Sequence, residues 1–397
     1  MSKRIAIKVK PAAERSIRNG HPWVFEGSIV KQSSGGQAGD TAIVFDKKNN
    51  KLLAVGLYDP ASPIRIKLIS FGKPATVGKA FFEQKIQQAF ELRRPLLLTG
   101  TNSYRLVHGE NDGLPGLVAD VYAEVLVVKL YSPIWLPYLQ NIFAILLKIS
   151  NCKTLVLRLS RSLQNENLPK GWSDGSVVFG ELEEEEVTFR EHGLRFSANV
   201  VKGHKTGFFL DHRHNRKRIG GLAKGKAVLD VFSYAGGFSV HALAGGAREV
   251  TSLDISGQAL QMAIKNAALN PHRGHHKTMK MDAFKGMEEL RRSGKMFDVV
   301  VVDPPSFAKK ESEVKGALNS YARLARLAVP LVKRGGVLLM ASCSSRVGAG
   351  LFFETVEPEM ESSGRKVELL EKTFHDVDHP VGFPEGAYLK AGFYRVA

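Results

Sequence analysis

The sequence predicts an α/β protein whose carboxyl-terminal half is a Rossmann-like, doubly wound and mostly parallel sheet, preceded by a small β-rich domain and a middle α+β domain. Three observations predict this class. The chain has 397 residues, which is long for one hydrophobic core and typical of two or three domains. Its first 72 residues hold short β-like runs between Gly, Asp and Pro. From residue 227 onward, apolar runs alternate with helical patterns, the rhythm of a parallel sheet covered on both faces.

The alternation after residue 227 predicts a specific order of elements. We expect strands at 227–232, 250–255, 277–281, 299–302 and 337–341, and helices at 258–269, 283–292, 320–332 and 351–361. The loops at the carboxyl ends of parallel strands form the binding site of such a sheet. The residues that directly follow each strand are therefore the first candidates for chemistry.

The chain before this sheet is organised in segments. We expect the β-rich domain at 1–72, a connector helix at 73–98, the α+β domain at 99–186, and a β-hairpin followed by the sheet at 187–397. The acidic turn from Gly109 to Gly116 does not match the spacing of an EF-hand, and we interpret it as a structural hairpin. The run from Glu183 to Glu186 is typical of a solvated boundary.

Charge and cysteine content restrict the partners and the compartment. The formal net charge of +17 favours polyanionic partners, of which nucleic acid is the commonest. The amino terminus lacks the apolar core of a signal peptide, and Ile142 to Leu147 is too short to cross a bilayer. Cys152 and Cys343 lie far apart without CxxC spacing, which argues against a disulfide framework and a cysteine zinc site. We therefore expect a cytoplasmic protein with no metal and no membrane partner.

One strand–turn–helix sequence predicts a cofactor site. The apolar run Val228–Phe232 breaks at small residues and continues into a helix-compatible segment from Phe238, as at the first crossover of a doubly wound sheet. Gly236 and Gly237 lack a Cβ atom, so the backbone can turn sharply and a ligand can approach closely. Asp254 follows a second apolar run, at about the distance where such sheets place the acid that receives ribose hydroxyls. This pair of features predicts an adenosine-containing cofactor.

Three later strand ends carry distinctive side chains. Asp282 can accept a hydrogen bond from an adenine amino group, or it can cap the helix that follows. Asp303, Pro304 and Pro305 follow four consecutive valines and form a rigid rim that can present a carboxylate to the polar edge of a flat heterocycle. Cys343 follows the fifth strand, opposite that acid, where a nucleophile would belong. The alternative is a buried, inert thiol, which would more often lie mid-strand among apolar residues.

Basic residues beside aromatic residues are candidates for RNA contact. Near the amino terminus Trp23 and Phe25 could stack bases, but for both we favour core packing. The segment 202–213 could line one wall of the cofactor pocket, with Phe208 or Phe209 against a flat ring. The basic helix that begins at His212 is either a solvated face or a phosphate contact. The predicted RNA-contacting residues are Arg15, Arg18, Lys205, Arg213, Arg216 and Lys217.

Several stretches of the sequence carry a family resemblance. They are His21–Phe25, Gly109–Gly116, Lys205–Asp211, Phe232–Phe238, Asp303–Pro305, Ser342–Ser344 and Pro384–Lys390. With Asp254, the glycine turn and the Asp303 rim resemble class I S-adenosylmethionine-dependent methyltransferases. More specifically, the set is similar to the RlmI group of bacterial large-subunit ribosomal RNA cytosine-5 methyltransferases, over almost the whole chain. The resemblance implies an amino-terminal PUA domain, a middle α+β domain and a Rossmann-like catalytic domain.

The resemblance also implies S-adenosylmethionine as cofactor, 23S ribosomal RNA as substrate, and roles for single residues. Asp303 would face the target base, and Cys343 would attack carbon 6 so that carbon 5 can take the methyl group. The methionine part of the cofactor would be surrounded by Asp230, Phe232 and Gly236, its ribose held by Asp254 and its adenine amino group by Asp282. The full implied cofactor set is Asp230, Phe232, Tyr234, Gly236, Asp254, Ile255, Asp282, Ala283, Asp303 and Phe208.

The sequence leaves alternatives open. Ser306 stands where many two-cysteine RNA cytosine-5 methyltransferases have a second cysteine, and the base that would release the Cys343 adduct is not identified. The Asp303 rim also suits methylation of another RNA base atom, such as a guanine ring nitrogen, with Cys343 a bystander. A non-catalytic RNA-binding assembly factor is a third hypothesis. The modified nucleotide, the choice between naked RNA and an assembling subunit, and the oligomeric state (a homodimer among the options) also stay open.

Overall fold

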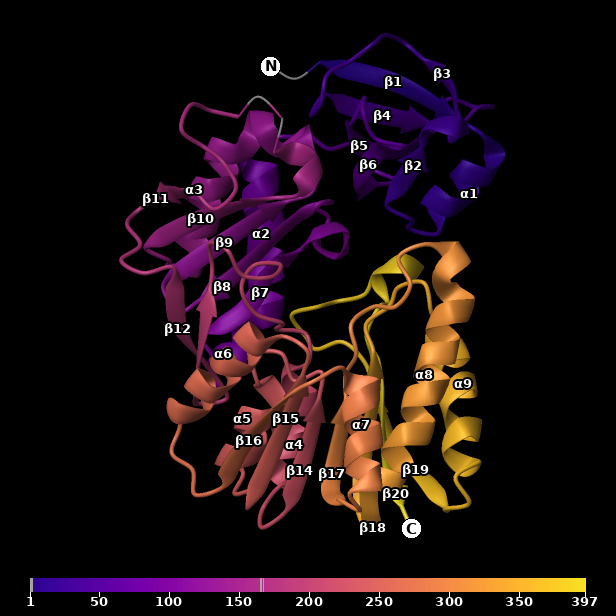
Figure 1. Cartoon of the computed structure of the whole chain (residues 1–397). Helices are drawn as coiled ribbons and strands as arrows, with labels where there is room; N and C mark the ends of the chain where they lie inside the picture. The colour runs from indigo at the N-terminus through magenta and orange to yellow at the C-terminus, as the bar shows by residue number, and fades with distance from the viewer. Residues whose placement is uncertain (1–2, 165, 167) are drawn as a thin grey trace. The chain divides into compact units, whose positions relative to one another are not determined.

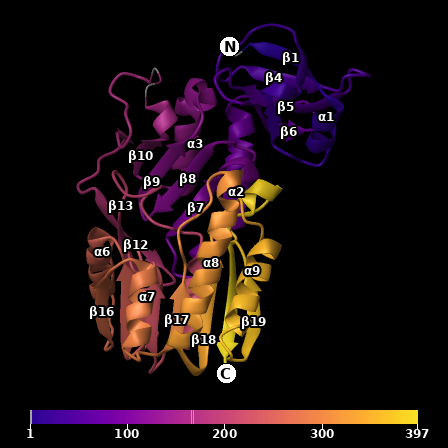
Figure 2. The same ribbon diagram turned by 45° about the vertical axis from the view of Figure 1, so that its right-hand side comes forward.

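The computed structural model describes residues 3–164, 166 and 168–397. The chain divides into two compact units, which are described separately (Figures 1 and 2). The first unit comprises Met1–Arg190, Ala198–Leu210 and Val377–Pro384, and the second comprises Glu191–Ser197, Asp211–Asp376 and Glu385–Ala397. The first unit therefore includes a short segment from near the carboxyl terminus.

The first unit begins with a six-stranded sheet in the order β2-β6-β5-β4-β1-β3. Its elements are β1 (Arg4–Val9), α1 (Pro11–Arg18), β2 (Trp23–Phe25), η1 (Glu26–Ser28), β3 (Ile29–Gln32), β4 (Thr41–Phe45), β5 (Leu52–Tyr58) and β6 (Ile64–Phe71). Alternate residues of β1, such as Ile5 and Ile7, are buried against Ile66 and Leu68 of β6 in one apolar core. The expected β-rich domain is confirmed.

A five-stranded sheet in the order β11-β10-β9-β8-β7 completes the first unit. Its elements are α2 (Lys79–Leu97), β7 (Ser103–His108), η2 (Gly109–Asp112), β8 (Leu117–Tyr122), β9 (Val125–Leu130), η3 (Pro133–Tyr138), α3 (Leu139–Ser150), β10 (Thr154–Leu159), η4 (Arg161–Leu163) and β11 (Val177–Phe179). The α2 helix was expected to be a connector, but Phe82 and Ile86 are fully buried in the core of this sheet. After β9 the chain forms the 3-10 turn η3 and becomes the α-helix α3 only after Pro137, because proline cannot donate the helical hydrogen bond.

A two-stranded hairpin, β12 (Glu186–Glu191) and β13 (Leu194–Asn199), contributes residues to both units. The second unit is built on a seven-stranded sheet in the order β16-β15-β14-β17-β18-β20-β19. Its elements are α4 (Arg213–Leu222), β14 (Ala227–Val231), α5 (Gly237–Ala244), β15 (Glu249–Asp254), α6 (Gly257–Ala268), β16 (His275–Lys280), α7 (Ala283–Arg292), β17 (Phe297–Val302), η5 (Glu311–Glu313), α8 (Val314–Ala328), η6 (Val329–Leu331), β18 (Val332–Ser342), α9 (Ala349–Glu361), β19 (Val367–Thr373), η7 (Pro384–Gly386) and β20 (Lys390–Val396).

The five strands expected in the second unit are all present and are parallel to one another. Two further strands were not expected: β20 pairs antiparallel with β18 and with β19. Figures 1 and 2 show α7, α8 and α9 along one face of the sheet. The helix expected at 320–332 ends earlier, at Ala328, because Pro330 lies in a 3-10 turn and β18 begins at Val332. The parallel pairing brings the carboxyl ends of β14, β15, β17 and β18 to one edge.

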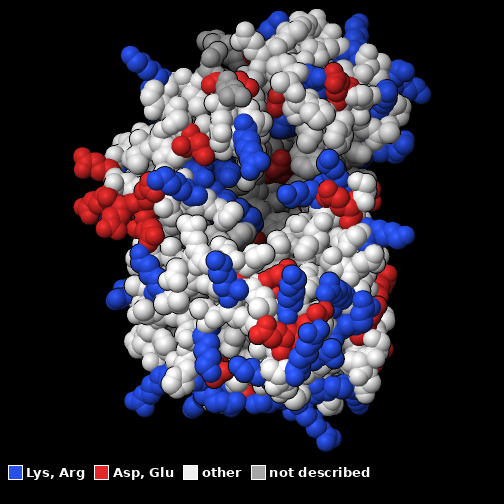
Figure 3. Space-filling model, viewed as in Figure 1, with Lys and Arg blue, Asp and Glu red and all other residues white. Residues whose placement is uncertain are grey.

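Lys and Arg side chains are spread over the face drawn in Figure 3, whereas Asp and Glu side chains gather densely at one edge. On this face, therefore, the basic side chains do not by themselves mark one binding surface. No helix in the described part of the chain combines the length and apolar character that a membrane crossing needs. Within the same residues, no group of three or more His, Cys, Asp or Glu side chains could hold a metal ion.

Candidate active site

The turn after β14 is held in an unusual backbone conformation. Phe232 and Tyr234 have φ angles of 64° and 47°, in the left-handed region that side chains other than glycine rarely adopt. Gly236 has φ of 78°, and a Cβ atom there would stand 2.8 Å from the Cβ of Ala263 on α6. Glycine at this position is therefore required by the packing of α6 as well as by the turn. Strain concentrated between a strand and a helix is typical of a functional turn.

Asp230, the fourth residue of β14, has an incomplete set of hydrogen bonds. It is 1% exposed, and its Oδ2 accepts bonds from the backbone N–H and the hydroxyl of Ser239 at 3.0 and 2.6 Å. Its Oδ1 is buried and has no hydrogen-bond partner among the described residues. Burial raises the pKa of Asp230 to about 7, against the bonds from Ser239, and the charge of Asp303 adds to the rise. An orphaned carboxylate oxygen suits a cationic group such as the ammonium of a methionine moiety.

Asp254, at the end of β15, organises the neighbouring turn. Its Oδ2 accepts from the backbone N–H of Tyr234 at 2.9 Å, and its Oδ1 accepts from the N–H of Ser256 at 2.8 Å. Each carboxylate oxygen can accept a second hydrogen bond, so capacity for ribose hydroxyls remains. Ile255 is 69% exposed beside it and offers an apolar surface to a flat ring. These features fit the expected ribose and adenine site.

Asp282 caps the helix that follows it. Its Oδ1 accepts from the backbone N–H of Lys285 at 3.1 Å at the start of α7, and Ala283 is buried behind it. The N-cap interpretation is therefore confirmed. A contact between the other oxygen of this half-buried carboxylate and an adenine amino group stays a prediction.

Asp303, the first residue after β17, lies beside His212, which belongs to the 202–213 segment expected to line one wall of the cofactor pocket and begins the basic helix. The Nε2 of His212 is 3.2 Å from Oδ1 of Asp303, whose side chain is 24% exposed. His212 is buried, and its Nδ1 contacts the Asn215 amide at 3.0 Å, while Asn215 accepts a bond from Thr373. Burial opposes protonation of the imidazole, but the carboxylate of Asp303 outweighs it and raises the pKa of His212. A carboxylate with one fixed oxygen and a paired imidazole can exchange a proton with a bound base.

Cys343 follows β18 directly and is half-buried. Its Sγ is 3.6 Å from the carbonyl oxygen of Pro304, so the thiol lies against the rim that Asp303 begins. The buried ammonium of Lys390 donates to the carbonyls of Ser344, Val347 and Tyr388 and so holds the loop that contains the thiol. Burial lowers the pKa of Lys390 to about 8, and the proximity of Cys343 opposes that shift.

Cys152, in the other unit, shows what a structural thiol looks like in this protein. It is 7% exposed, and its Sγ is 3.9 Å from the carbonyl of Ala123. Burial raises the pKa of Cys152 to about 11. The two cysteines therefore lie in distinct settings: Cys343 directly follows a strand and lies against the carbonyl of Pro304, whereas Cys152 does not follow a strand.

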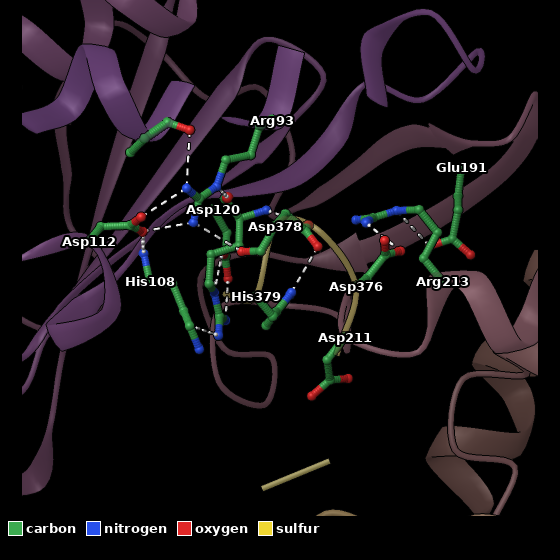
Figure 4. A network of polar contacts seen from close by, with 12 residues as sticks. Arg93, His108, Asp112, Asp120, Glu191, Asp211, Arg213, Asp376, Asp378 and His379 are labelled. Carbon is green, nitrogen blue, oxygen red and sulfur yellow. Dashed lines mark hydrogen bonds and ion pairs between the residues drawn. The ribbon is translucent and has the colours of Figure 1, made fainter. Parts of the chain in front are cut away.

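Two of the predicted RNA-contacting arginines are placed differently from our expectation. Arg213 is fully buried between Glu191, at 3.8 Å, and Asp376, at 3.3 Å (Figure 4). Arg216 is 3% exposed and donates two bonds to the Glu191 carboxylate, at 2.7 and 2.6 Å. Both alternatives considered for this helix, a solvated face and a phosphate contact, are wrong for these two residues. The acid that pairs with them lies more than twenty residues away in sequence, so local composition gave no signal.

The other predicted contacts are divided between surface and interior. Phe208 is buried in the first unit against Phe189, with ring centroids 5.2 Å apart, so its expected role as an open pocket wall is not supported there. Arg15, Arg18, Lys205 and Lys217 are exposed, as a phosphate contact requires. Phe25 is 46% exposed, which contradicts the core packing that we favoured for it.

The fold and the site define a class of enzyme. The strand order, the strained turn after β14, the acid at the end of β15 and the Asp303 rim are the features expected at the cofactor end of an S-adenosylmethionine-dependent methyltransferase. The family model with that description matches residues 104–391, and a PUA-like domain model matches residues 7–71. The residues fit the cofactor, because Asp230 keeps a buried oxygen for its ammonium group and Asp254 keeps capacity for its ribose.

Comparison with known proteins identifies the family within that class. A ribosomal RNA large subunit methyltransferase of Deinococcus radiodurans is 44% identical over 99% of this chain and 98% of its own length. A ribosomal RNA large subunit methyltransferase I of Shewanella denitrificans is 37% identical over 99% of both chains. The protein belongs to this RlmI-like family. A Streptococcus mutans structure described as a SAM-dependent methyltransferase shares the fold, with a TM-score of 0.82, 20% identity and coverage of 98% of this chain and 100% of that one.

Proposed function

We propose that the protein forms 5-methylcytosine in 23S ribosomal RNA through a covalent adduct with Cys343. The observation that carries this proposal is the 3.6 Å contact between Cys343 Sγ and the Pro304 carbonyl, next to Asp303. The names of the relatives support a large-subunit ribosomal RNA substrate, and the net charge of +17 suits a polyanion. S-adenosylmethionine supplies the methyl group when it is bound.

The proposed chemistry needs a nucleophile, an acid and a base. Carbon 5 of cytosine is a poor nucleophile until the Cys343 thiolate bonds to carbon 6, which breaks the carbon 5–carbon 6 double bond and leaves an enamine-like ring. Asp303 would hydrogen-bond the ring edge and stabilise that adduct. After methyl transfer, a base removes the carbon 5 proton, the double bond re-forms, and the thiolate leaves with the electrons of the sulfur–carbon bond.

His212 and Lys390 are the residues that we add to this scheme. His212 lies 3.2 Å from Asp303, so it can hold one carboxylate oxygen and leave the other to the substrate. Through that contact a proton could reach or leave Asp303 without bulk water, since His212 is buried. Lys390 fixes the Cys343 loop through three carbonyls, and its positive charge favours the thiolate.

The decisive experiment replaces the two cysteines separately. Cys343→Ser should lower 5-methylcytosine formation by at least about 1000-fold while leaving S-adenosylmethionine binding intact, because a hydroxyl is a far weaker nucleophile than a thiolate. The matched control, Cys152→Ser, should retain activity. Nucleoside mass spectrometry of RNA treated with labelled cofactor measures the product, and calorimetry measures cofactor binding.

An RNA in which the target cytosine carries fluorine at carbon 5 sharpens the test. Fluorine cannot leave as a proton does, so the adduct should persist and migrate as a protein–RNA complex that resists denaturation, absent in Cys343→Ser. Methylation of another base atom, with full activity in Cys343→Ser and loss in Asp303→Ala, would overturn the cytosine assignment. Failure to bind S-adenosylmethionine at all would favour a non-catalytic assembly factor.

A further inference from the structure

A chain of hydrogen bonds runs from Asp230 across three elements of the second unit. The hydroxyl of Ser239, the third residue of α5, is 2.6 Å from Asp230 Oδ2 and 2.6 Å from the hydroxyl of Ser252 on β15. The Ser252 hydroxyl is in turn 2.8 Å from Nε2 of His276 on the edge strand β16. Both serines are fully buried, whereas His276 is half-buried. The chain therefore connects a buried carboxylate to a partly exposed imidazole.

The register of the sheet places the strand residues of this chain on one face. Asp230 is directly opposite Ser252 in the parallel pairing of β14 with β15. His276 is opposite Val250, two residues before Ser252, so both side chains point to the same side. Thr251, between them on β15, points to the other face, and its hydroxyl has no hydrogen-bond partner among the described residues. Strand pairing thus fixes which hydroxyl of β15 belongs to the chain.

The direction of the hydrogen bonds is coupled to the protonation state of Asp230, because each serine hydroxyl has a single proton to donate. When Asp230 is ionised, its Oδ2 accepts from Ser239, and the Ser239 oxygen accepts from Ser252. The Ser252 oxygen then accepts from the Nε2–H of His276. When Asp230 carries a proton on Oδ2, that proton is donated to Ser239 and each later bond reverses. An imidazole fits both states, because its Nε2 donates in one neutral tautomer and accepts in the other.

The charged groups around Asp230 oppose its ionisation. Burial raises the pKa of Asp230 to about 7, and the carboxylates of Asp303 and Asp254 also raise it, whereas the two bonds from Ser239 lower it. At the other end of the chain, burial lowers the pKa of His276, and the nearby His272 lowers it further. The ionised form of Asp230 therefore depends on how strongly the Ser239 hydroxyl donates.

We propose that Ser252 and His276 are positioning residues for the cofactor, which act through the Ser239 hydroxyl. They keep Asp230 ionised and oriented, with Oδ2 held by the chain and Oδ1 left for the ammonium group of S-adenosylmethionine. A hydroxyl that accepts a hydrogen bond becomes a stronger donor, so the bond from Ser252 strengthens the bond from Ser239 to the carboxylate. The inference rests on the proposed contact of Asp230 with the cofactor and is independent of the cytosine chemistry.

Two ligands distinguish this role from a general loss of structure. S-adenosylhomocysteine carries the ammonium group, whereas methylthioadenosine has the same nucleoside without the amino acid part. In Ser252→Ala, S-adenosylhomocysteine should bind at least about threefold more weakly at pH 7, because a larger share of Asp230 is protonated. Its affinity should approach that of the wild type at pH 8.5, and the affinity for methylthioadenosine should be unchanged at both pH values. Calorimetry with the full chain measures both ligands without RNA.

The other members of the chain supply graded variants and controls. Ser239→Ala should weaken S-adenosylhomocysteine binding more than Ser252→Ala does, because its hydroxyl contacts the carboxylate directly. His276→Phe should have the smallest effect, and His276→Gln should restore wild-type affinity, because the glutamine amide can donate from the position of Nε2. The matched control is Thr251→Val, which removes a hydroxyl of the same strand outside the chain and should change neither affinity.

A titration of the Asp230 carboxyl group by carbon-detected NMR, without ligand, separates the two parts of the proposal. The pKa of Asp230 should be higher in Ser252→Ala than in the wild type or in Thr251→Val. An unchanged pKa in Ser252→Ala, or an equal loss of affinity for both ligands, would overturn the proposed role of the chain. A raised pKa with wild-type affinity for S-adenosylhomocysteine at pH 7 would instead remove Asp230 from the cofactor site, and the proposal would fail with it.

Discussion

Buried polar groups are treated differently in the two units of this protein. In the first unit, Arg105 meets Asp120 through two bonds of 2.8 and 2.9 Å, and Arg93 meets Asp112 in the same way. In the second unit, Asp230 Oδ1 and the hydroxyl of Ser233 are buried without a hydrogen-bond partner among the described residues. Both residues belong to the second unit.

This difference distinguishes buried polar groups that stabilise the fold from buried polar groups that can bind a ligand. A fully paired network fixes one arrangement of its elements, and native proteins normally satisfy buried polar groups. An unsatisfied carboxylate oxygen at the end of a strand costs stability unless a ligand supplies the missing partner. The paired network in the first unit therefore stabilises that unit, whereas the unsatisfied oxygen of Asp230 in the second unit is one that we propose binds the cofactor.

Breaking the paired network should produce the largest loss of stability. Arg105→Met would leave the Asp120 carboxylate buried without its charged partner, with the bond from the Thr206 hydroxyl kept, and we expect a loss of about 3–5 kcal/mol in the free energy of unfolding. Chemical denaturation followed by circular dichroism measures it. The matched control, Glu83→Gln, removes an exposed ion pair with Lys148 and should cost at most about 1 kcal/mol. Equal losses in both variants would show that the buried pair has no special role.

Asp230→Asn tests the second part of this comparison, the buried carboxylate with an unsatisfied oxygen. The pKa of about 7 in the folded protein lies above the ordinary value of an aspartate, so folding retains a proton that the unfolded chain releases. Stability should therefore fall as the pH rises towards 7, and the asparagine variant, which carries no charge, should lose this dependence. We expect its melting temperature to exceed that of the wild type at pH 8 and to approach it at pH 4, in thermal scans without cofactor.

The same substitution should weaken cofactor binding. An ionised Asp230 attracts the cofactor ammonium, so wild-type affinity for S-adenosylmethionine should increase between pH 6 and pH 7.5, and the affinity of Asp230→Asn should be lower and nearly independent of pH. Calorimetry at both pH values measures this. A variant that binds as tightly as wild type at pH 7.5 would remove Asp230 from the cofactor site.

The sequence patterns predicted the helices and site residues that depend on neighbours in the sequence, and they failed for contacts between residues far apart in the sequence. The bounds of α7 match the expectation, because Asp282 caps its first turn and its apolar positions repeat at helical spacing. The Asp303 rim and Cys343 were identified because each directly follows an apolar strand. Arg213 and Arg216 were misjudged because their partner, Glu191, is distant in sequence. His212 was missed for the same reason: its contact with Asp303 exists only once β17 is in place.

The pKa of the His212 imidazole reports directly on the contact between His212 and Asp303. Its pKa should lie above the ordinary histidine value in the wild type, so the ring stays protonated to higher pH than an isolated histidine. In Asp303→Asn the carboxylate that raises it is gone and burial prevails, so the pKa should fall below the ordinary value. Nitrogen-detected NMR titration of the imidazole resolves the two cases. An unchanged titration would show that Asp303 does not control this group.

The smallest expected effect separates the two roles of Asp282. Asp282→Ala removes the N-cap of α7 and should cost about 1 kcal/mol of unfolding free energy. Asp282→Ser keeps a capping oxygen, so its stability should stay close to that of the wild type. If the second carboxylate oxygen holds the adenine amino group, the serine variant should nevertheless bind S-adenosylmethionine several-fold more weakly, because a hydroxyl cannot reach both partners. Stability and affinity that change together in both variants would mean that Asp282 serves the helix alone, and the adenine contact would then have to come from another residue at this edge of the sheet.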